Sequence, residues 1–343
     1  MNNYYHTLYK DAFNTRTPIT CTIELTRECN FRCLHCYIPS NRQVFLSFDQ
    51  VKRFVDSIVA KGCLFFTITG GDIFVHPDFE RIYEYIFLKG CVITLFSNGS
   101  LLNKSHLALF QKYPPAGFEI TLYGASEETY QKTVGVRLFE RTINNIKLLV
   151  ENNFTVLLKM FVMKENYDDF EAVVNISKDL GCSFKFDCMI IDDVCSSTIS
   201  HQITPDQIIR LNSLAKSKIN KEYDPEYEQF LLQMTLGKLF KCGAGRISCV
   251  LKANNEIRMC TFLEEYSFSL NDYSFDEVWN IYGKVVELPE NKLDKCTICA
   301  FKDSCYQCPA RSSSILKCIY PQPYPHFCEV SERLYKQSLN NND

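Results

Sequence analysis

Short strand-like runs alternate with longer helix-like segments from residue 20 to about residue 188. The short runs are rich in Ile, Val, Phe, Thr and Leu, which suit a pleated sheet. Strands are predicted at residues 20–25, 64–69, 92–97, 118–122, 155–162 and 183–188. Helices are predicted between them at residues 47–61, 77–89, 103–111, 139–152 and 166–180. The alternation therefore predicts six β/α units.

Capping residues support these helix limits. Ser47, followed by Asp49 and Gln50, opens the first helix, and Gly62 and Gly90 stand where C-terminal caps belong. Six β/α units in about 170 residues indicate an α/β fold with a parallel sheet and helices outside it. Periodicity alone does not separate a partial barrel from a doubly wound sheet.

The alternation stops near residue 189. Residues 190–241 predict a helical bridge with helices at 203–219 and 225–239, the first opened by Thr204-Pro205. Residues 242–335 have short segments, turn residues and many cysteines, so we expect metal to hold this region together. We expect residues 1–19 to be a short lead-in and residues 336–343 a polar tail.

Composition and charge narrow the possible functions. The 343 residues are 46% hydrophobic and 22% charged, which suits a globular protein with a sizeable core. A net charge of -3 gives no reason to expect nucleic acid or an anionic membrane as a partner. The N-terminal stretch has no apolar signal-peptide core, and no apolar run of about 18 residues occurs. The 18 cysteines therefore favour a reducing, cytoplasmic compartment and metal binding over disulfides.

Three cysteines follow the first predicted strand with the spacing C-x3-C-x2-C, at Cys29, Cys33 and Cys36. Three thiolates on one short loop can bind three irons of a [4Fe–4S] cluster, and the fourth iron then stays open to a small molecule. Two plainer interpretations are a zinc site that lacks one ligand and three buried core thiols.

With His35 before the last cysteine and Tyr37 after it, this array resembles that of radical S-adenosylmethionine (SAM) enzymes. The resemblance implies a partial (β/α)6 barrel, similar to a TIM barrel, over residues 20–189. It also implies one SAM-binding [4Fe–4S] cluster, an electron from which cleaves SAM to a 5′-deoxyadenosyl radical that abstracts hydrogen from a substrate. An exposed cluster of this kind suits anaerobic conditions.

Further segments at strand ends resemble the SAM-binding motifs of the family, although Gly-Gly-acid and Asn-Gly are also ordinary turns. Asp72 stands where the family more often has a glutamate that binds the amino group of SAM. The resemblance also implies contacts from Thr121 to the ribose or methionine, from Lys159 to the methionine carboxylate, and from His35 to adenine. The predicted SAM contacts are His35, Tyr37, Gly70, Gly71, Asp72, Ser97, Asn98, Thr121 and Lys159.

The cysteines after residue 241 allow two interpretations. By spacing alone, two C-x2-C pairs could bind zinc as a four-cysteine ribbon. With the cysteines on either side, their order resembles the SPASM extension of radical SAM enzymes, which holds two auxiliary [4Fe–4S] clusters. By position, one auxiliary cluster would use Cys242, Cys249, Cys260 and Cys308. The other would use Cys296, Cys299, Cys305 and Cys328.

Two departures from the SPASM pattern bear on this assignment. Only Tyr306 and Gln307 separate Cys305 from Cys308, one residue fewer than is usual. Asn255 replaces a turn glycine, a change that asparagine tolerates. Cys318 is the alternative to Cys328 as the last ligand. The cysteines that lie in apolar runs are expected in the core, at Cys21, Cys63, Cys91, Cys182 and Cys188.

The resemblance, which covers roughly residues 18–335, implies an oxidoreductase that modifies a ribosomally made precursor peptide. Such an enzyme would form a thioether or carbon–carbon cross-link, with an auxiliary cluster as electron acceptor. The alternatives are a formylglycine-forming sulfatase-type maturase, a peptide epimerase, and haem or small-molecule tailoring. Thr261 disfavours the first, because those maturases carry an acidic residue there. A non-catalytic metal-binding scaffold is a further alternative.

We expect a flavodoxin or ferredoxin-type reductant and, since no leader-recognition domain is evident, a possible separate protein for that task. The general base or hydrogen donor is not identified. Asp187, Asp192 and Asp193 are candidates because barrel active sites form at the carboxyl ends of strands. Acidic residues in such loops are more commonly solvated.

Overall fold

A curved sheet runs through the fold, with strand order β6-β5-β4-β3-β2-β1-β7-β8-β9. The computed structural model describes residues 3–38, 43–190, 198–218, 225–291, 295–302, 305 and 307–340. The strands are β1 (Thr20–Glu24), β2 (Phe65–Thr69), β3 (Val92–Ser97), β4 (Gly117–Thr121), β5 (Val156–Phe161), β6 (Ser183–Asp187), β7 (Ser248–Leu251), β8 (Glu256–Arg258) and β9 (Phe268–Ser269). The α-helices are α1 (Asn3–Thr15), α2 (Phe48–Val59), α3 (Phe79–Leu88), α4 (Lys104–Lys112), α5 (Glu127–Val134), α6 (Phe139–Glu151), α7 (Phe170–Asp179), α8 (Pro205–Lys218), α9 (Pro225–Met234), α10 (Phe275–Val285), α11 (Pro309–Leu316) and α12 (Pro325–Asn340).

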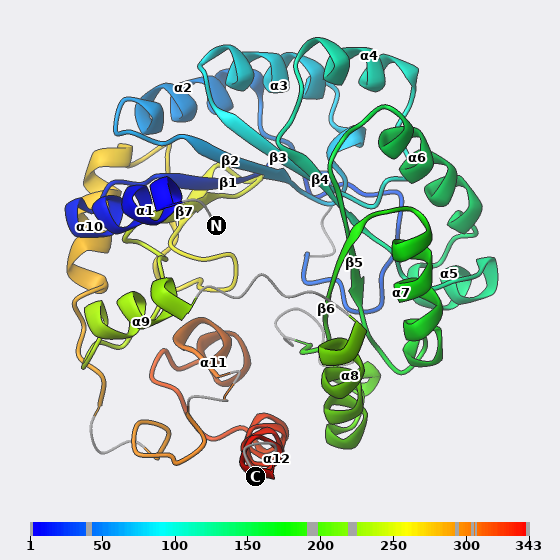
Figure 1. The fold of residues 1–343 in the computed structure, drawn as a ribbon. Coiled ribbons are helices and arrows are strands. Elements are labelled where there is room, and N and C mark those ends of the chain that lie inside the picture. Colours follow the sequence, from blue (N-terminus) through cyan, green and yellow to red (C-terminus); the bar gives the residue numbers. More distant parts are fainter. Residues whose placement is uncertain are drawn as a thin grey trace.

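The first six strands form the predicted partial barrel. Each pairs in parallel with the next one along the chain. Their helices lie outside the curve of the sheet (Figure 1). A doubly wound sheet would reverse its strand order part-way through these β/α units, whereas strands β1 to β6 run in one unbroken order. The α/β class is confirmed, and all six strands lie within one residue of their predicted limits.

Two helices of the barrel differ from the prediction. Helix α5 was missed, although Ser126 caps its start and Gly135, with φ of 76°, ends it. Helix α7 begins at Phe170 instead of residue 166. The reason is that the Asn166 side chain is used elsewhere: it accepts from the Met163 N–H and donates to the carbonyls of Tyr123 and Phe161.

The cysteine-rich region begins as part of the barrel sheet. Strand β7 pairs in parallel with β1, and β8 and β9 follow as antiparallel neighbours. Helix α10 buries Val278 and Tyr282 in the same apolar core as the barrel, and the Tyr282 hydroxyl donates to the carbonyls of Ile257 and Tyr266. The expectation that metal holds this whole region together was therefore wrong for its first part, because apolar packing attaches that part to the barrel.

Both ends of the described chain are helical. Helix α1 takes up most of the expected lead-in, and the carbonyl of Arg16 just after it accepts a hydrogen bond from the indole of Trp279. Helix α12 packs against α8 and extends into the expected polar tail, as far as Asn340. Among the described residues, no helix combines the length and the apolar character needed to cross a membrane.

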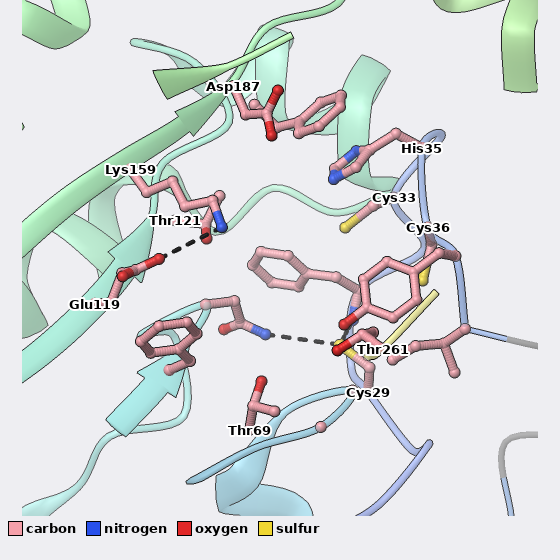
Figure 2. A pocket seen from close by; sticks show the side chains of 18 of the residues that line it. Cys29, Cys33, His35, Cys36, Thr69, Glu119, Thr121, Lys159, Asp187 and Thr261 are labelled. Carbon is pink, nitrogen blue, oxygen red and sulfur yellow. Dashed lines mark hydrogen bonds and ion pairs between the residues drawn. The ribbon is translucent and has the colours of Figure 1, made fainter. Parts of the chain in front are cut away.

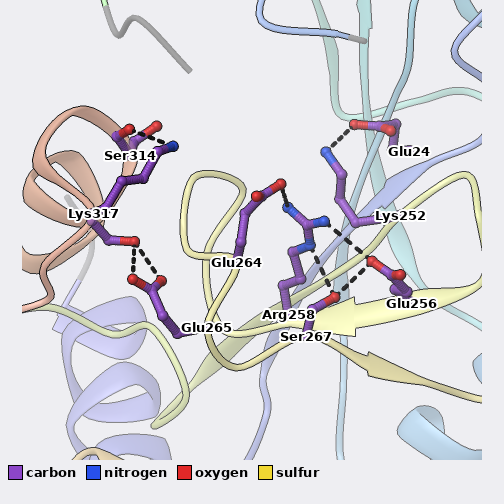
Figure 3. A network of polar contacts seen from close by, with 10 residues as sticks. Glu24, Lys252, Glu256, Arg258, Glu264, Glu265, Ser267, Ser314 and Lys317 are labelled. Atoms are coloured by element: carbon purple, nitrogen blue, oxygen red, sulfur yellow. Dashed lines mark hydrogen bonds and ion pairs between the residues drawn. The ribbon is translucent and has the colours of Figure 1, made fainter. Parts of the chain in front are cut away.

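A buried ion pair fastens the added strands to the barrel. Glu24, at the end of β1, is 2% exposed and Lys252, directly after β7, is 6% exposed. Their side chains point toward each other and form a salt bridge (Figure 3). Buried charges of this kind are tolerated only when paired, since each has lost its hydration. The pair therefore ties β1 to β7 at the edge of the barrel opening.

Replacing Lys252 with Met should leave the Glu24 carboxylate buried without its partner. We expect a loss of about 3–5 kcal/mol in the free energy of unfolding, measured by urea titration of the apoprotein. The double variant Glu24→Gln/Lys252→Met should recover most of that loss. If Lys252→Met were as stable as the double variant, burying the Glu24 carboxylate without its partner would cost no stability, and the prediction would be wrong.

Candidate active site

A cavity of about 420 Å³ opens at the carboxyl ends of the barrel strands. The cysteine loop, with Cys29, Cys33 and Cys36, forms one side, and side chains from β4 and β5 lie opposite (Figure 2). The C-terminal region contributes a further wall through Thr261, Phe262 and Arg311. The cavity thus brings together residues from three distant parts of the sequence.

The cysteine loop is held by backbone hydrogen bonds from two directions. The N–H groups of Gly71 and Asp72 donate to the carbonyls of Thr26 and Glu28 at 2.8 and 2.9 Å. On the other side, the N–H groups of Arg32 and Leu34 donate to carbonyls at the end of α5. A Cβ atom on Gly71 would lie 2.1 Å from the Glu28 carbonyl oxygen. Gly71 therefore has to be a glycine, because the backbone of the cysteine loop passes too close to leave room for a side chain.

Asp72 lies behind the cavity instead of lining it. Its carboxylate is fully buried and accepts hydrogen bonds from Ser97 Oγ at 2.7 Å, Asn98 N at 2.9 Å and Phe74 N at 3.0 Å. Burial raises the pKa of Asp72, against the lowering effect of these three donors. The structure therefore places the predicted ammonium ligand under the turn after β3.

His35 stacks face to face on Phe161, with ring centroids 4.1 Å apart and an interplanar angle of 2°. Burial and the charge of Lys159 lower the pKa of His35 to about 3, so the ring is neutral at physiological pH. Within the described residues, its buried Nδ1 atom has no hydrogen-bond partner. A polar ligand in the cavity would supply one.

A charged group lies on the strands opposite the cysteines. Glu119 on β4 is 5% exposed and pairs with Lys159 at 3.4 Å and Lys185 at 2.5 Å. Glu119 was not predicted, although it lies two residues before Thr121 and so shares its face of the strand. Asp187 also lines the cavity, but its Oδ1 accepts from the N–H groups of Cys188 and Met189.

The other predicted SAM contacts line the cavity, namely His35, Tyr37, Gly70, Gly71, Ser97, Asn98, Thr121 and Lys159. Tyr37 stands on the side of the C-terminal region, where its ring meets Phe262 edge-on at 5.2 Å. Phe161 and Arg311 were missed, because neither lies in a motif that the sequence marks. Asp192 and Asp193 lie outside the described residues.

The cysteines of the C-terminal region fall into separate groups. Burial raises the pKa of Cys260 to about 11, and the nearby thiols of Cys242 and Cys308 contribute to this rise. Burial also raises the pKa of Cys328, and the nearby thiols of Cys305 and Cys299 raise it further.

Cys249 lies elsewhere, fully buried between strands. It pairs in register with Cys21 across β1 and β7, and the neighbouring thiol of Cys249, after burial, raises the pKa of Cys21. Strand alternation explains this, since Cys249 faces the helices outside the barrel with Cys21. The structure therefore brings together three of the four thiols predicted for one auxiliary cluster, and places the fourth in the core.

The donor set fits an iron–sulfur cluster with SAM. Among the described residues, no three His, Cys, Asp or Glu side chains converge as ligands of a single metal ion do. Thiolates around one zinc ion lie within about 4 Å of each other, whereas cluster thiolates bind different irons and stand further apart. The loop thiols share one cavity wall, and Lys159 and the unpartnered His35 nitrogen face a space that a polar ligand can fill.

Residues 23–176 match the sequence profile of the Radical SAM superfamily. The chain is 27% identical over 304 residues to the antilisterial bacteriocin subtilosin biosynthesis protein AlbA of Bacillus subtilis (strain 168), covering 84% of this chain and 65% of AlbA. It is 24% identical over 333 residues to the AdoMet-dependent heme synthase of Methanosarcina barkeri, covering 87% and 93% of the two chains.

A solved structure has the same fold. SuiB of Streptococcus suis, bound to S-adenosylmethionine, superposes with a TM-score of 0.72 at 16% identity, over 94% of this chain and 82% of SuiB. SuiB has also been solved with its precursor peptide SuiA. At this identity the likeness shows the fold alone. The partial barrel predicted for the first six strands is thereby confirmed.

The close approach of the loop makes a sharp prediction for Gly71→Ala. The new methyl group must displace the Glu28 carbonyl, so we expect a loss of about 3 kcal/mol in unfolding free energy, measured by urea titration. The matched control is Gly90→Ala, where the added Cβ meets open space and only the positive φ of 77° is strained, at about 1–2 kcal/mol. Equal losses in the two variants would contradict the role assigned to the loop contact.

Proposed function

We propose that this chain, whose residues 23–176 match the Radical SAM superfamily, matures a ribosomally made peptide by forming a thioether or carbon–carbon cross-link. The observation that carries the proposal is the cavity wall made by Cys29, Cys33 and Cys36 at the strand ends. AlbA supports the peptide substrate, because its name assigns it to subtilosin biosynthesis. The SuiB–SuiA complex supports it too, because its fold matches and its partner is a precursor peptide.

The three loop thiolates would hold a [4Fe–4S] cluster with one iron open to SAM. When bound, these cofactors supply a 5′-deoxyadenosyl radical that takes a hydrogen atom from the substrate. The neutral ring of His35 and the ring of Phe161 offer an aromatic surface for adenine, and Lys159 offers a cation for the methionine carboxylate. The protein's part is to orient these groups and to exclude water from the cavity.

Two auxiliary [4Fe–4S] clusters are proposed for the C-terminal region. Cys242, Cys260 and Cys308 would hold one of them, without Cys249. Cys296, Cys299, Cys305 and Cys328 would hold the other. Cys328 is preferred to Cys318 because Cys299 and Cys305 lie beside it. A peptide thiol that closes a C–S bond on a carbon radical releases one proton and one electron, and an auxiliary cluster is the electron acceptor that this step needs.

Haem tailoring is the second candidate. The AdoMet-dependent heme synthase matches this chain along 93% of its own length, whereas AlbA is matched along 65%. Release of 5′-deoxyadenosine in the presence of a cysteine-containing precursor peptide, with a peptide product lighter by two hydrogens, would support the first candidate. Release driven by an iron porphyrin, with no change in any peptide, would support the second.

Metal content tests the cluster assignments. Anaerobically reconstituted wild-type protein should hold about twelve irons, and the variant with Cys29, Cys33 and Cys36 changed to Ala should hold about eight. That variant should also release no 5′-deoxyadenosine from SAM. Four irons with bound zinc in the wild type would contradict the two auxiliary clusters.

Cys249 and Cys308 make a matched pair for a second metal measurement. Cys308→Ala should lower the iron content by about four atoms, because it removes one of three thiolates from a cluster. Cys249→Ala should keep the wild-type iron content and lose only stability, because its thiol packs in the core. Loss of iron in Cys249→Ala to the extent seen in Cys308→Ala would restore Cys249 as a ligand.

A further inference from the structure

The turn after β3 directs a side-chain amide at the cysteine loop. Asn98 is 5% exposed, and its Nδ2 lies 3.8 Å from Cys29 Sγ and 2.9 Å from Asn30 Oδ1. Figure 2 marks the contact to Cys29 with a dashed line. By resemblance this amide was expected to face SAM. The structure places it against a sulfur of the loop.

The orientation of the amide follows from its other contacts. Asn98 Oδ1 lies 2.9 Å from the backbone N of Ser100 and 2.7 Å from Ser100 Oγ. A backbone N–H can only donate, so the atom facing it must be the amide oxygen. The NH₂ group is therefore the one that faces Cys29. It has two hydrogens, one for Asn30 and one for the sulfur.

Asp72 holds this amide in place. Its carboxylate accepts the backbone N–H of Asn98 at 2.9 Å and the hydroxyl of Ser97 at 2.7 Å, and the Ser97 oxygen accepts the N–H of Gly99 at 2.9 Å. Because Asp72 is itself fixed to Glu28 through its backbone N–H, the loop, the Gly-Gly-Asp turn and the β3 turn form one rigid unit.

We propose that Asn98 donates a hydrogen bond to the Cys29 thiolate and thereby raises the reduction potential of the cluster on this loop, with Asp72 as the positioning residue. The proposal rests on the proposed function, because it requires that the loop hold a cluster. The reduced cluster carries one more negative charge than the oxidised one. A donor to a ligand sulfur therefore stabilises the reduced form more, and hydrogen bonds to sulfur are a known determinant of cluster potential.

The sulfur of Cys29 is shielded from water, because the residue is only 8% exposed, and the N–H of Phe31 also donates to it at 3.3 Å. In a buried site of low dielectric constant, a hydrogen bond is electrostatically stronger than in water. We therefore expect about a tenfold change in the ratio of reduced to oxidised cluster, which is the order of effect that one hydrogen bond to a charged group can have.

The test is a redox titration monitored by electron paramagnetic resonance on the full-length, anaerobically reconstituted protein without SAM. The signal of the loop cluster is the one that disappears in the Cys29/Cys33/Cys36→Ala variant. Asn98→Ala should hold about tenfold less reduced cluster at a fixed potential, which is a shift of about 59 mV to more negative values for one electron. Asn98→Asp keeps an acceptor for Ser100 while removing the donor, and should shift in the same direction.

Asn145→Ala is the matched control. Asn145 donates to the carbonyls of Gly99 and Ser100 in the same turn, and, among the residues that the structure describes, it has no hydrogen bond to a ligand sulfur as Asn98 does. Its loss removes contacts to the turn, but Asp72, Asn30 and Ser100 still hold Asn98, so the midpoint potential should be unchanged. A shift in Asn145→Ala equal to that in Asn98→Ala, or unchanged midpoints in both Asn98 variants at full iron content, would overturn the proposal.

Asp72→Ala separates the positioning role from SAM binding. We expect a shift to more negative potential without SAM, in the direction seen for Asn98→Ala. Weaker SAM binding with no shift in the SAM-free potential would instead make Asp72 a SAM ligand and overturn its assigned role. Failure of the proposed function would look different. The variant with Cys29, Cys33 and Cys36 changed to Ala would then hold as much iron as the wild-type protein.

Discussion

The backbone contact between the cysteine loop and the Gly-Gly turn is the constraint on which the rest of the site depends. Gly71 and Asp72 donate to the carbonyls of Thr26 and Glu28, and no side chain fits between these two segments. The contact fixes the loop against the end of β2. It also brings the β3 turn, through Asp72, against the sulfur of Cys29.

The C-terminal region depends on the same edge of the barrel. Strand β7 continues the sheet beyond β1, and the Glu24–Lys252 pair closes the seam beside the cavity. Thr261 and Phe262 follow β8 and line the cavity, and Phe262 meets Tyr37 of the loop edge-on. The wall formed by Thr261 and Phe262 is therefore built on the barrel sheet, next in sequence to Cys260 of one proposed auxiliary cluster.

The sequence predicts the barrel well because its strands are short runs rich in Ile, Val, Phe, Thr and Leu that alternate with helix-like segments. Features that depend on contacts between distant segments were missed. Cys249 has the spacing of a ligand, but the pairing of β7 with β1 turns it toward Cys21 in the core. Asp72 has the position of a ligand, but three donors hold it under the β3 turn. Arg311 reaches the cavity only because α11 folds back onto the barrel opening.

The central claim is that the loop thiols hold a cluster whose open iron binds SAM. It is tested most directly by pulsed electron paramagnetic resonance of the reduced protein with SAM labelled with ¹⁵N at its amino group. The account predicts a hyperfine coupling between that nitrogen and the cluster signal that is lost in the Cys29/Cys33/Cys36→Ala variant. A loop-cluster signal that is unchanged by SAM and shows no nitrogen coupling would contradict it.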